Sequence, residues 1–313
     1  MSDLAGIIIM LVTPLDEKRK QDEGSLRNMI RYYLDARIDG FTALGEVSER
    51  DRLMPKEKED NLRIVMDEVD GKVPVIVGTS QEGTELAVDA AVKAEEAGAA
   101  AVMVAPPKNI KLRDDAIFEH YAAISDAIKI PIVVQDEPES NHPYLSPALI
   151  ARISSEIARA RYLKLEDPPT PTKITKVKRL VGDKMKIFGA FYGRASLWEL
   201  ERGAIGIMTS SATPEYLVGM WEAMKKGEKE RASEIFFSTD PLINFYGDMS
   251  VAVRKEILAY RHVIGSGKMK MPAGELGDSE RRELQELMVW TENRLRMLSL
   301  PPLYFERKKE RTA

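Results

Sequence analysis

The feature that most constrains the fold of this chain is an alternation, repeated eight times, between short apolar runs and longer amphipathic segments. Residues 22–35 show the amphipathic pattern, since Leu26, Ile30 and Tyr33 recur at the three- and four-residue spacing of one helix face. A short apolar run bounded by turn residues is typical of a parallel strand buried on both faces. The apolar runs are residues 6–12, 41–44, 73–78, 100–105, 131–135, 162–165, 185–190 and 204–208.

Eight strand–helix units joined by short connections predict an α/β fold, a closed (β/α)8 TIM barrel. An open, doubly wound sheet is the alternative, but it usually carries a glycine-rich phosphate turn after its first strand, and none follows Val12. We therefore assign residues 1–227 to the barrel. Residues 228–313 show no strand pattern, so we expect a C-terminal helical region there. Its expected helices cover residues 232–237, 251–264 and 279–297.

Several helix starts are marked by capping residues. A hydroxyl side chain at the N-cap accepts a hydrogen bond from a backbone N–H, and proline fits the first helical turn. We predict that Thr84 caps the third helix and that Ser146 with Pro147 opens the fifth. Thr213 with Pro214 is expected to open the eighth.

The composition excludes several kinds of function. A formal net charge of −4 over 313 residues argues against a nucleic-acid or membrane-surface partner, because both need clustered basic charge. The chain has no cysteine, and its three histidines lack the paired spacing of a zinc site. No apolar run reaches membrane-spanning length, and residues 1–5 lack a basic, apolar leader. We therefore expect a soluble cytoplasmic protein without a metal or other cofactor, a nucleic-acid partner or a membrane anchor.

A lysine, Lys164, interrupts the sixth apolar run shortly before Pro168 and Pro169 turn the chain. Its ammonium can reach water from the end of the strand, which is a structural explanation. Alternatively, desolvation favours the neutral amine, which is a nucleophile toward ketones. In a (β/α)8 barrel the chemistry lies at the carboxyl ends of the strands, and Lys164 lies at such an end among small polar groups and carboxylates. This position favours a Schiff-base lysine over a metal or phosphate site.

Short motifs along the chain have the order and spacing of motifs in a known enzyme family. They are Leu11 to Pro14, Gly40 to Leu53, Pro74 to Thr79, Pro131 to Val134, Leu145 to Pro147, Lys164 with Glu166, and Gly206 to Thr209. On these motifs the chain resembles the dihydrodipicolinate synthase / N-acetylneuraminate lyase family of class I aldolases over essentially its whole length. The resemblance implies homo-oligomers, in which barrels pair and assemble further into tetramers.

The resemblance also implies a set of site residues. Lys164 would form an imine with a 2-oxo acid such as pyruvate. The turn after the second strand would hold the substrate carboxylate through hydroxyl and backbone N–H groups, and Ser48 is the one hydroxyl in that turn. The residues expected to bind substrate are Gly45, Glu46, Val47, Ser48 and, on the eighth strand, Met208.

The sequence departs from the family pattern around this site. Glu46 and Val47 stand where the family usually has two threonines, which removes two hydroxyl donors and adds a negative charge. Gln135 stands at the end of the fifth strand, where a tyrosine usually relays protons, and an amide is neither an acid nor a base. Residues 137–141 replace the arginine with which the synthases grip the carboxylate of their second substrate.

Other residues must then supply the proton relay. Tyr192, after the seventh strand, is one candidate, and packing at the rim is its structural alternative. Glu46 can act as a general base if burial raises its pKa, or it is a solvated loop carboxylate. Only one of Asp136 and Glu137 can point inward in an extended segment. Glu166 shares the face of the lysine, where it either pairs with the amine or assists catalysis.

Two hypotheses follow for the function. The first is a lyase, an aldolase or dehydratase, that forms an imine with pyruvate or a related 2-oxo acid and has Lys164, Tyr192 and Gln135 at its catalytic positions. The second is a non-catalytic or regulatory barrel that binds a 2-oxo acid and has lost turnover. In both, the partner is a small molecule, and the chain is expected to form a dimer or tetramer.

Overall fold

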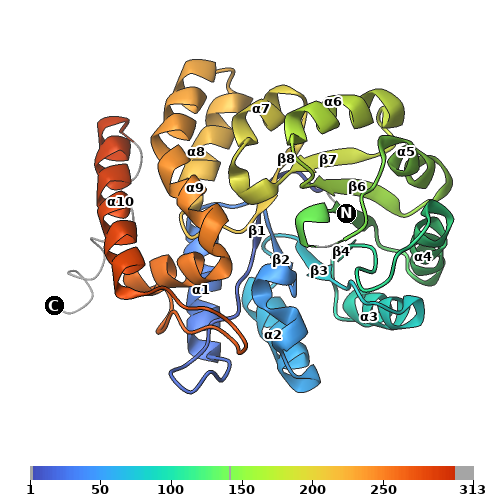
Figure 1. Ribbon diagram of the computed structural model, residues 1–313, viewed down its shortest axis with the longest axis horizontal. Helices are drawn as coiled ribbons and strands as arrows, with labels where there is room; N and C mark the ends of the chain where they lie inside the picture. Colours follow the sequence, from blue (N-terminus) through green and yellow to red (C-terminus); the bar gives the residue numbers. More distant parts are fainter. Residues whose placement is uncertain (1–2, 141, 300–313) are drawn as a thin grey trace. The chain divides into compact units, whose positions relative to one another are not determined.

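The computed structural model describes residues 3–140 and 142–299, and the fold is the expected (β/α)8 TIM barrel with a C-terminal helical extension (Figure 1). Eight parallel strands close in sequence order, and β8 pairs back onto β1. Each strand overlaps a predicted apolar run. The strands are β1 (Gly6–Met10), β2 (Gly40–Ala43), β3 (Val75–Gly78), β4 (Ala101–Val104), β5 (Ile132–Asp136), β6 (Ala160–Leu165), β7 (Lys186–Gly189) and β8 (Gly206–Thr209). Asn141, within the segment expected to replace the arginine, lies outside the described residues, as do residues 1–2 and 300–313.

The chain divides into two compact units. The first runs up to Met10, includes Asp39–Glu46 and Val69–Thr209, and holds all eight strands. Its helices are α3 (Thr84–Glu96), α4 (Asp114–Ala127), α5 (Pro147–Glu156), α6 (Thr170–Val181) and α7 (Ser196–Glu201), with short 3₁₀ turns η3 (Pro138–Ser140) and η4 (Phe191–Gly193). The second unit comprises Leu11–Ile38, Val47–Glu68 and the residues from Ser210 onward. It contains α1 (Glu23–Asp35), nearly all of α2 (Pro55–Val69), the 3₁₀ turn η2 (Arg50–Arg52), α8 (Pro214–Lys225), α9 (Lys229–Tyr260) and α10 (Asp278–Met297).

Burial on both faces explains why the strands read as apolar runs. Every residue of β1 and β3 is buried, because one face of a barrel strand packs in the interior and the other against helices. At Gly78 the close packing leaves no room for a side chain, since a Cβ there would lie 2.3 Å from the carbonyl oxygen of Leu44. Polar residues within these buried runs, such as Gln135 and Lys164, are therefore not explained by packing alone.

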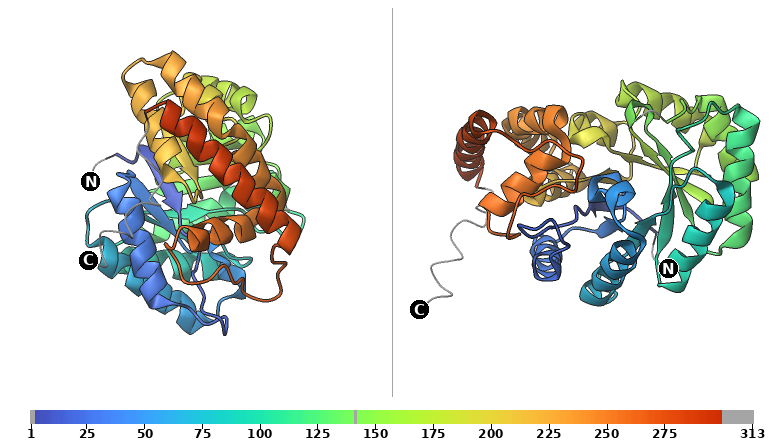
Figure 2. Two further views of the ribbon diagram at one scale, coloured as in Figure 1. Left: turned by 90° about the vertical axis from the view of Figure 1, so that its left-hand side faces the viewer. Right: turned by 60° about the horizontal axis from the view of Figure 1, so that its bottom comes forward.

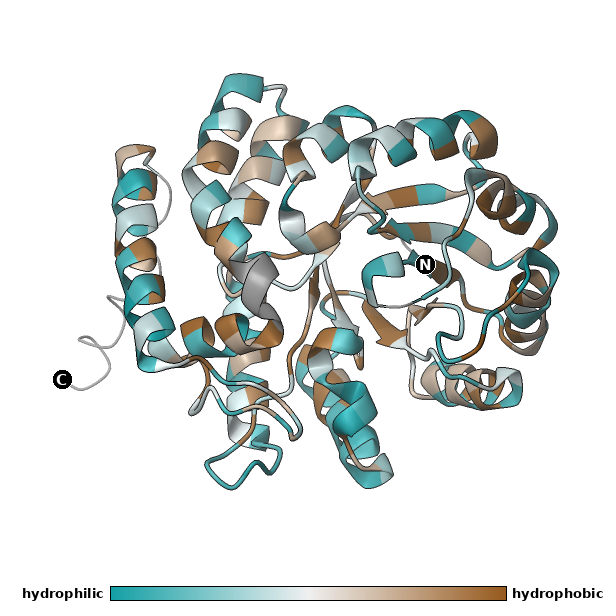
Figure 3. Cartoon of the chain, viewed as in Figure 1, coloured by the Kyte–Doolittle hydropathy of each residue, from teal (hydrophilic) through white to brown (hydrophobic). Residues whose placement is uncertain are grey.

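The helices of the first unit largely follow the predicted pattern. α4 buries Ile117, Tyr121 and Ile124, which recur at the three- and four-residue spacing of one helix face. Figure 3 shows α4 and α5 carrying both hydrophobic and hydrophilic residues along their length, which suits a helix with one buried side. Ser146 caps α5 as predicted, because its Oγ accepts a hydrogen bond from the backbone N–H of Leu149 at 3.1 Å.

Two of the predicted caps differ in the structure. Thr84 is the first residue of α3 and not its cap, which is Gly83. The Thr84 hydroxyl instead forms a 3.0 Å hydrogen bond with Nδ1 of His120 on α4. Thr213 occupies the N-cap position of α8, but its side chain makes no capping hydrogen bond.

The second unit contains one correction to the predicted helices. The segments expected at 232–237 and 251–264 are joined in a single helix, α9, which ends at Tyr260, before the expected bound, and packs against α8 and α10 (Figure 2). Pro241 lies inside α9, where it lacks an N–H to donate, yet the helix continues through it. The predicted domain boundary at residue 227 falls in the turn between α8 and α9, and as a boundary it stays a prediction. Within the described residues, no helix combines the length and the apolar character needed to cross a bilayer.

Candidate active site

Lys164 lies near the carboxyl end of β6, in register with Gln135 of β5, and only 1% of its surface is exposed. The neighbouring residue Asp136 points to the helix layer, since its Oδ2 lies 2.7 Å from Nζ of Lys173 on α6. Side chains alternate along a strand, so Gln135 and Lys164 point into the barrel interior. The structural alternative, an ammonium that reaches water, is therefore wrong.

A carboxylate holds the lysine amine. Nζ of Lys164 donates to Oε2 of Glu166 at 2.6 Å, and Nε2 of Gln135 donates to the same oxygen at 3.0 Å. The Gln135 amide also lies 3.3 Å from Oε2 of Glu137, whose Oε1 accepts from the Ser140 hydroxyl at 2.7 Å. The structure thus shows the pairing role proposed for Glu166, while its catalytic role stays a prediction. Of the two carboxyls left open by the sequence, Glu137 shares the inward face and Asp136 does not.

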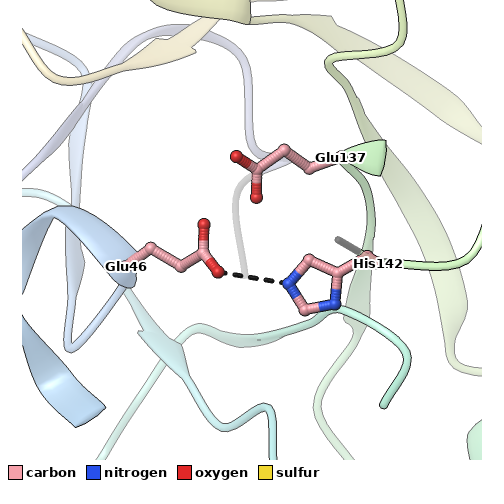
Figure 4. Close-up of side chains that lie close together, drawn as sticks. All are labelled: Glu46, Glu137 and His142. Carbon is pink, nitrogen blue, oxygen red and sulfur yellow. Dashed lines mark hydrogen bonds and ion pairs between the residues drawn. The ribbon is translucent and has the colours of Figure 1, made fainter. Parts of the chain in front are cut away.

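Beside Glu137 lie a second carboxyl, Glu46, and a histidine, His142 (Figure 4). Nε2 of His142 lies 3.1 Å from Oε1 of Glu46, and Nδ1 lies 2.7 Å from the carbonyl oxygen of Pro106. The ammonium of Lys108 lies 3.5 Å from the same Glu46 oxygen. We call Glu46, Glu137 and His142 the carboxyl–histidine cluster.

The pKa values of the two carboxyls of the cluster are shifted in opposite directions. Burial raises the pKa of Glu137 far above its ordinary value, and the neighbouring Glu166 and Glu46 add to this rise. Burial also acts to raise the pKa of Glu46, but hydrogen bonds from His142 and Glu137 outweigh it, so this pKa lies below its ordinary value. The hypothesis that Glu46 has a raised pKa and so acts as a general base is therefore wrong, because the hydrogen bonds reverse the effect of burial. One carboxyl of the pair holds a proton while the other is ionised.

The cluster could in principle hold a cation, because its three ligand atoms all lie within 4.8 Å of one another. The positive charge that Glu46 needs is already supplied by Lys108 and by the hydrogen bond to His142. We therefore interpret the cluster as a proton-sharing group. The predicted absence of a metal and of other cofactors stays a prediction.

The other predicted site residues are spread over several elements. Gly45 follows β2, where a Cβ would lie 2.6 Å from Cε of Met10, and Met208 is buried on β8. Tyr192 lies on η4 with φ of 59°, and its ring packs on Phe191 at 5.4 Å between centroids. Its role as a proton relay stays a prediction. Val47 and Ser48 follow Glu46 in the 3₁₀ turn η1 (Glu46–Ser48) and belong to the second unit, so their contact with substrate also stays a prediction.

Comparison with known proteins places this chain in a family. The model of the Dihydrodipicolinate synthetase family matches residues 3–289. The chain belongs to this family. Members of the dihydrodipicolinate synthetase family are lyases, and the chain is accordingly a lyase of this family.

Individual relatives of this dihydrodipicolinate synthetase family member carry two different names. An L-2-keto-3-deoxyarabonate dehydratase from Azospirillum brasilense is 32% identical, over 89% of this chain and 92% of the relative. A 4-hydroxy-tetrahydrodipicolinate synthase from Methanopyrus kandleri is 30% identical, over 76% of this chain and 80% of the relative. Among solved structures, a dihydrodipicolinate synthase from Rhodopseudomonas palustris has a TM-score of 0.86 and 29% identity, covering 92% of this chain and 97% of its own.

A further buried carboxyl, Glu199 on α7, lies against β7 and was not foreseen from the sequence. It is 0% exposed and accepts a hydrogen bond from the Thr170 hydroxyl at the start of α6. Its place requires a glycine on β7, because a Cβ at Gly189 would lie 2.2 Å from Oε2 of Glu199. Burial raises the pKa of Glu199 to about 7, against the opposing effect of the Thr170 hydrogen bond.

This raised pKa gives a testable pH dependence of stability. A carboxyl whose pKa is higher in the folded state stabilises the fold at pH below its ordinary value, and that contribution is lost as the pH rises through the folded pKa. As the pH rises from 5 to 8, we expect ionisation of Glu199 to lower the free energy of unfolding by up to about 3 kcal/mol. Urea unfolding of Glu199→Gln at both pH values should show a pH-dependent loss that is smaller by about this amount. The exposed Glu201→Gln is the control, and an unchanged pH dependence in Glu199→Gln would contradict the assignment.

Proposed function

We propose that the protein is a Schiff-base lyase whose Lys164 forms an imine with the C2 carbonyl of a 2-oxo acid. The observation that carries this proposal is a lysine 1% exposed, pointing into the barrel at the carboxyl end of β6 and held by Glu166. Nζ attacks the carbonyl carbon, and the carbonyl oxygen leaves as water. When the amine becomes an imine, Glu166 no longer pairs with a lysine ammonium but keeps the Gln135 amide as a donor, and it is placed to accept a proton from C3 of the bound acid.

The substrate class we propose is a 2-keto-3-deoxy sugar acid that loses water. The relative from Azospirillum brasilense named L-2-keto-3-deoxyarabonate dehydratase supports this choice. Gln135 in place of the relay tyrosine supports it further, because it separates this chain from the synthase pattern. In the proposed reaction, the enamine forms by loss of the C3 proton, and its electron pair then expels the C4 hydroxyl. The products are water and an unsaturated imine, which hydrolysis releases from Lys164.

The surroundings of Lys164 suit this chemistry better than a condensation with a second substrate. Residues 137–141, the segment in which the synthases of this family grip the carboxylate of their second substrate with an arginine, contain no arginine here. Gly45 and Met208, two of the predicted substrate-binding residues of the first unit, would contact the bound acid. By family likeness we further propose a cytoplasmic homo-oligomer, a dimer or tetramer.

A substrate panel tests the proposed function. The enzyme is incubated with pyruvate and with 2-keto-3-deoxy sugar acids of five and six carbons, and products are read by mass spectrometry. We expect a sugar acid to lose one water, at a rate that Lys164→Ala reduces to background. Release of pyruvate and an aldehyde would instead indicate an aldolase. Absence of turnover across the panel would favour the alternative of a non-catalytic, 2-oxo-acid-binding barrel.

A further inference from the structure

We propose that the carboxyl–histidine cluster is the acid of this reaction, with Glu137 delivering a proton to the departing C4 hydroxyl and Glu46 with His142 holding that proton in place. This inference rests on the proposed function, since it needs a substrate bound at Lys164. It names the proton donor that the site otherwise lacks, because Gln135, an amide, stands where the family usually has a proton-relaying tyrosine.

The first argument is position. The Gln135 amide nitrogen bonds to Glu166 at 3.0 Å and lies 3.3 Å from Glu137, so one side chain fixes both carboxyls on the inward face. Glu166 in turn bonds to the Lys164 amine. A substrate bound to that amine therefore has Glu166 and Glu137 as neighbouring carboxyls, and its C4 lies two carbons beyond the imine carbon.

The second argument is a count of protons. A carbonyl oxygen only accepts hydrogen bonds, so Nδ1 of His142, 2.7 Å from the Pro106 oxygen, carries a hydrogen. The 3.1 Å contact between Nε2 and Glu46 then contains one proton on one of the two atoms. This contact can supply a proton to Glu137, because the carboxylate oxygens and the histidine nitrogen of the cluster lie within 4.8 Å of one another.

The third argument is charge. The charged groups around Glu137 are Glu46 after β2 with its partners Lys108 and His142, and Lys164 of β6 with Glu166, which follows that strand. Lys108 and His142 contact Glu46 and Lys164 contacts Glu166, so these cationic groups are paired with the other two carboxyls, and the effect of Lys164 on the pKa of Glu137 is smaller than those of Glu166 and Glu46. Like-charge repulsion and burial therefore keep Glu137 protonated, as a carboxylic acid that can donate.

The step balances within these groups. The enamine electron pair forms the C3–C4 double bond as the C4–O bond breaks, and the Glu137 proton goes to the departing oxygen, which leaves as water. Glu137, now ionised, regains a proton from the contact between Glu46 and His142. Solvent restores the proton of that contact and removes the C3 proton from Glu166 between turnovers.

Glu137→Gln separates this role from a structural one. The rate of water loss should fall about 10²- to 10⁴-fold, the usual contribution of general acid catalysis. Borohydride trapping of the pyruvate imine on Lys164 and exchange of the pyruvate C3 protons in D2O should both remain. A substrate with fluorine at C4 should react with the variant at close to the wild-type rate, because fluoride leaves without a proton. Glu139→Gln, an exposed carboxyl on η3, is the matched control and should keep full activity on the hydroxyl substrate.

The outcomes distinguish this inference from the proposed function. Absence of a trapped imine in the wild type would overturn the Schiff-base function itself. Two results would overturn the role of Glu137 alone, provided that the imine is trapped in the wild type. In the first, Glu137→Gln dehydrates the substrate at the wild-type rate. In the second, the variant is slowed as much on the fluorinated substrate as on the hydroxyl one.

If Glu137→Gln does not fold, Glu46→Gln is used in its place. Removing the negative charge beside Glu137 should lower its pKa and shift the alkaline limb of the dehydration pH profile to lower pH, and an unshifted limb would contradict the role of the pair.

Discussion

Lys164→Arg is expected to abolish turnover, with a loss of about 10⁴-fold or more, the scale that follows removal of an enzyme's nucleophile. Arginine keeps a positive charge that can pair with Glu166, which lies 2.6 Å from the lysine nitrogen. A guanidinium remains protonated, however, and cannot form an imine with a ketone. The effect should therefore appear in the catalytic rate, measured on the sugar acid that the wild type dehydrates.

The control for this variant is Lys186→Arg. Lys186 begins β7, at the opposite end of the strand from the proposed chemistry, and pairs with Asp3 at 2.6 Å. Its replacement by arginine should leave the rate unchanged. Activity in Lys164→Arg within about tenfold of the wild type would show that the reaction does not pass through an amine at this position.

Lys255→Met is expected to lower the free energy of unfolding by about 3–5 kcal/mol, the usual cost of removing one partner from a buried ion pair. Lys255 and Glu49 have fully buried side chains and pair with each other within the second unit. Glu49 also accepts from the backbone N–H of Lys270 at 2.6 Å, so it is held in place when the lysine is lost. Burial lowers the pKa of Lys255, and the pairing with Glu49 opposes that shift.

Urea unfolding with matched variants tests this prediction. In Lys255→Met with Glu49→Gln, no buried carboxylate is left without its lysine, so part of the lost stability should return. Lys93→Met is the surface control, because the pair of Lys93 with Asp89 is exposed and worth about 0–1 kcal/mol. A loss in Lys255→Met no larger than in Lys93→Met would show that the buried pair does not support this unit.

The fold was predictable because its signals are local. Strand residues buried on both faces produce apolar runs, and one-sided helices such as α4 produce their own spacing. The errors also have local causes. A proline usually ends a helix, yet α9 continues through Pro241, and a threonine near a helix start can bond elsewhere, as Thr84 does with His120.

The candidate site was only partly predictable. The period of two along a strand places Lys164 and Glu166 on one face, which the structure confirms. The place of His142 in the site could not be predicted from such a period. It lies in the irregular segment between η3 and α5, and it contacts Glu46 across 96 residues of chain. The order of burial and hydrogen-bond effects on the pKa of Glu46 likewise depends on neighbours that only the folded chain brings together.

Borohydride reduction with a saturating 2-oxo acid, followed by intact mass and peptide mapping, tests the central claim most directly. The account predicts one reduced adduct per chain, located on Lys164 and absent from Lys164→Arg. An unmodified Lys164 with pyruvate and with every sugar acid tried, or an adduct that persists in Lys164→Arg, would contradict it.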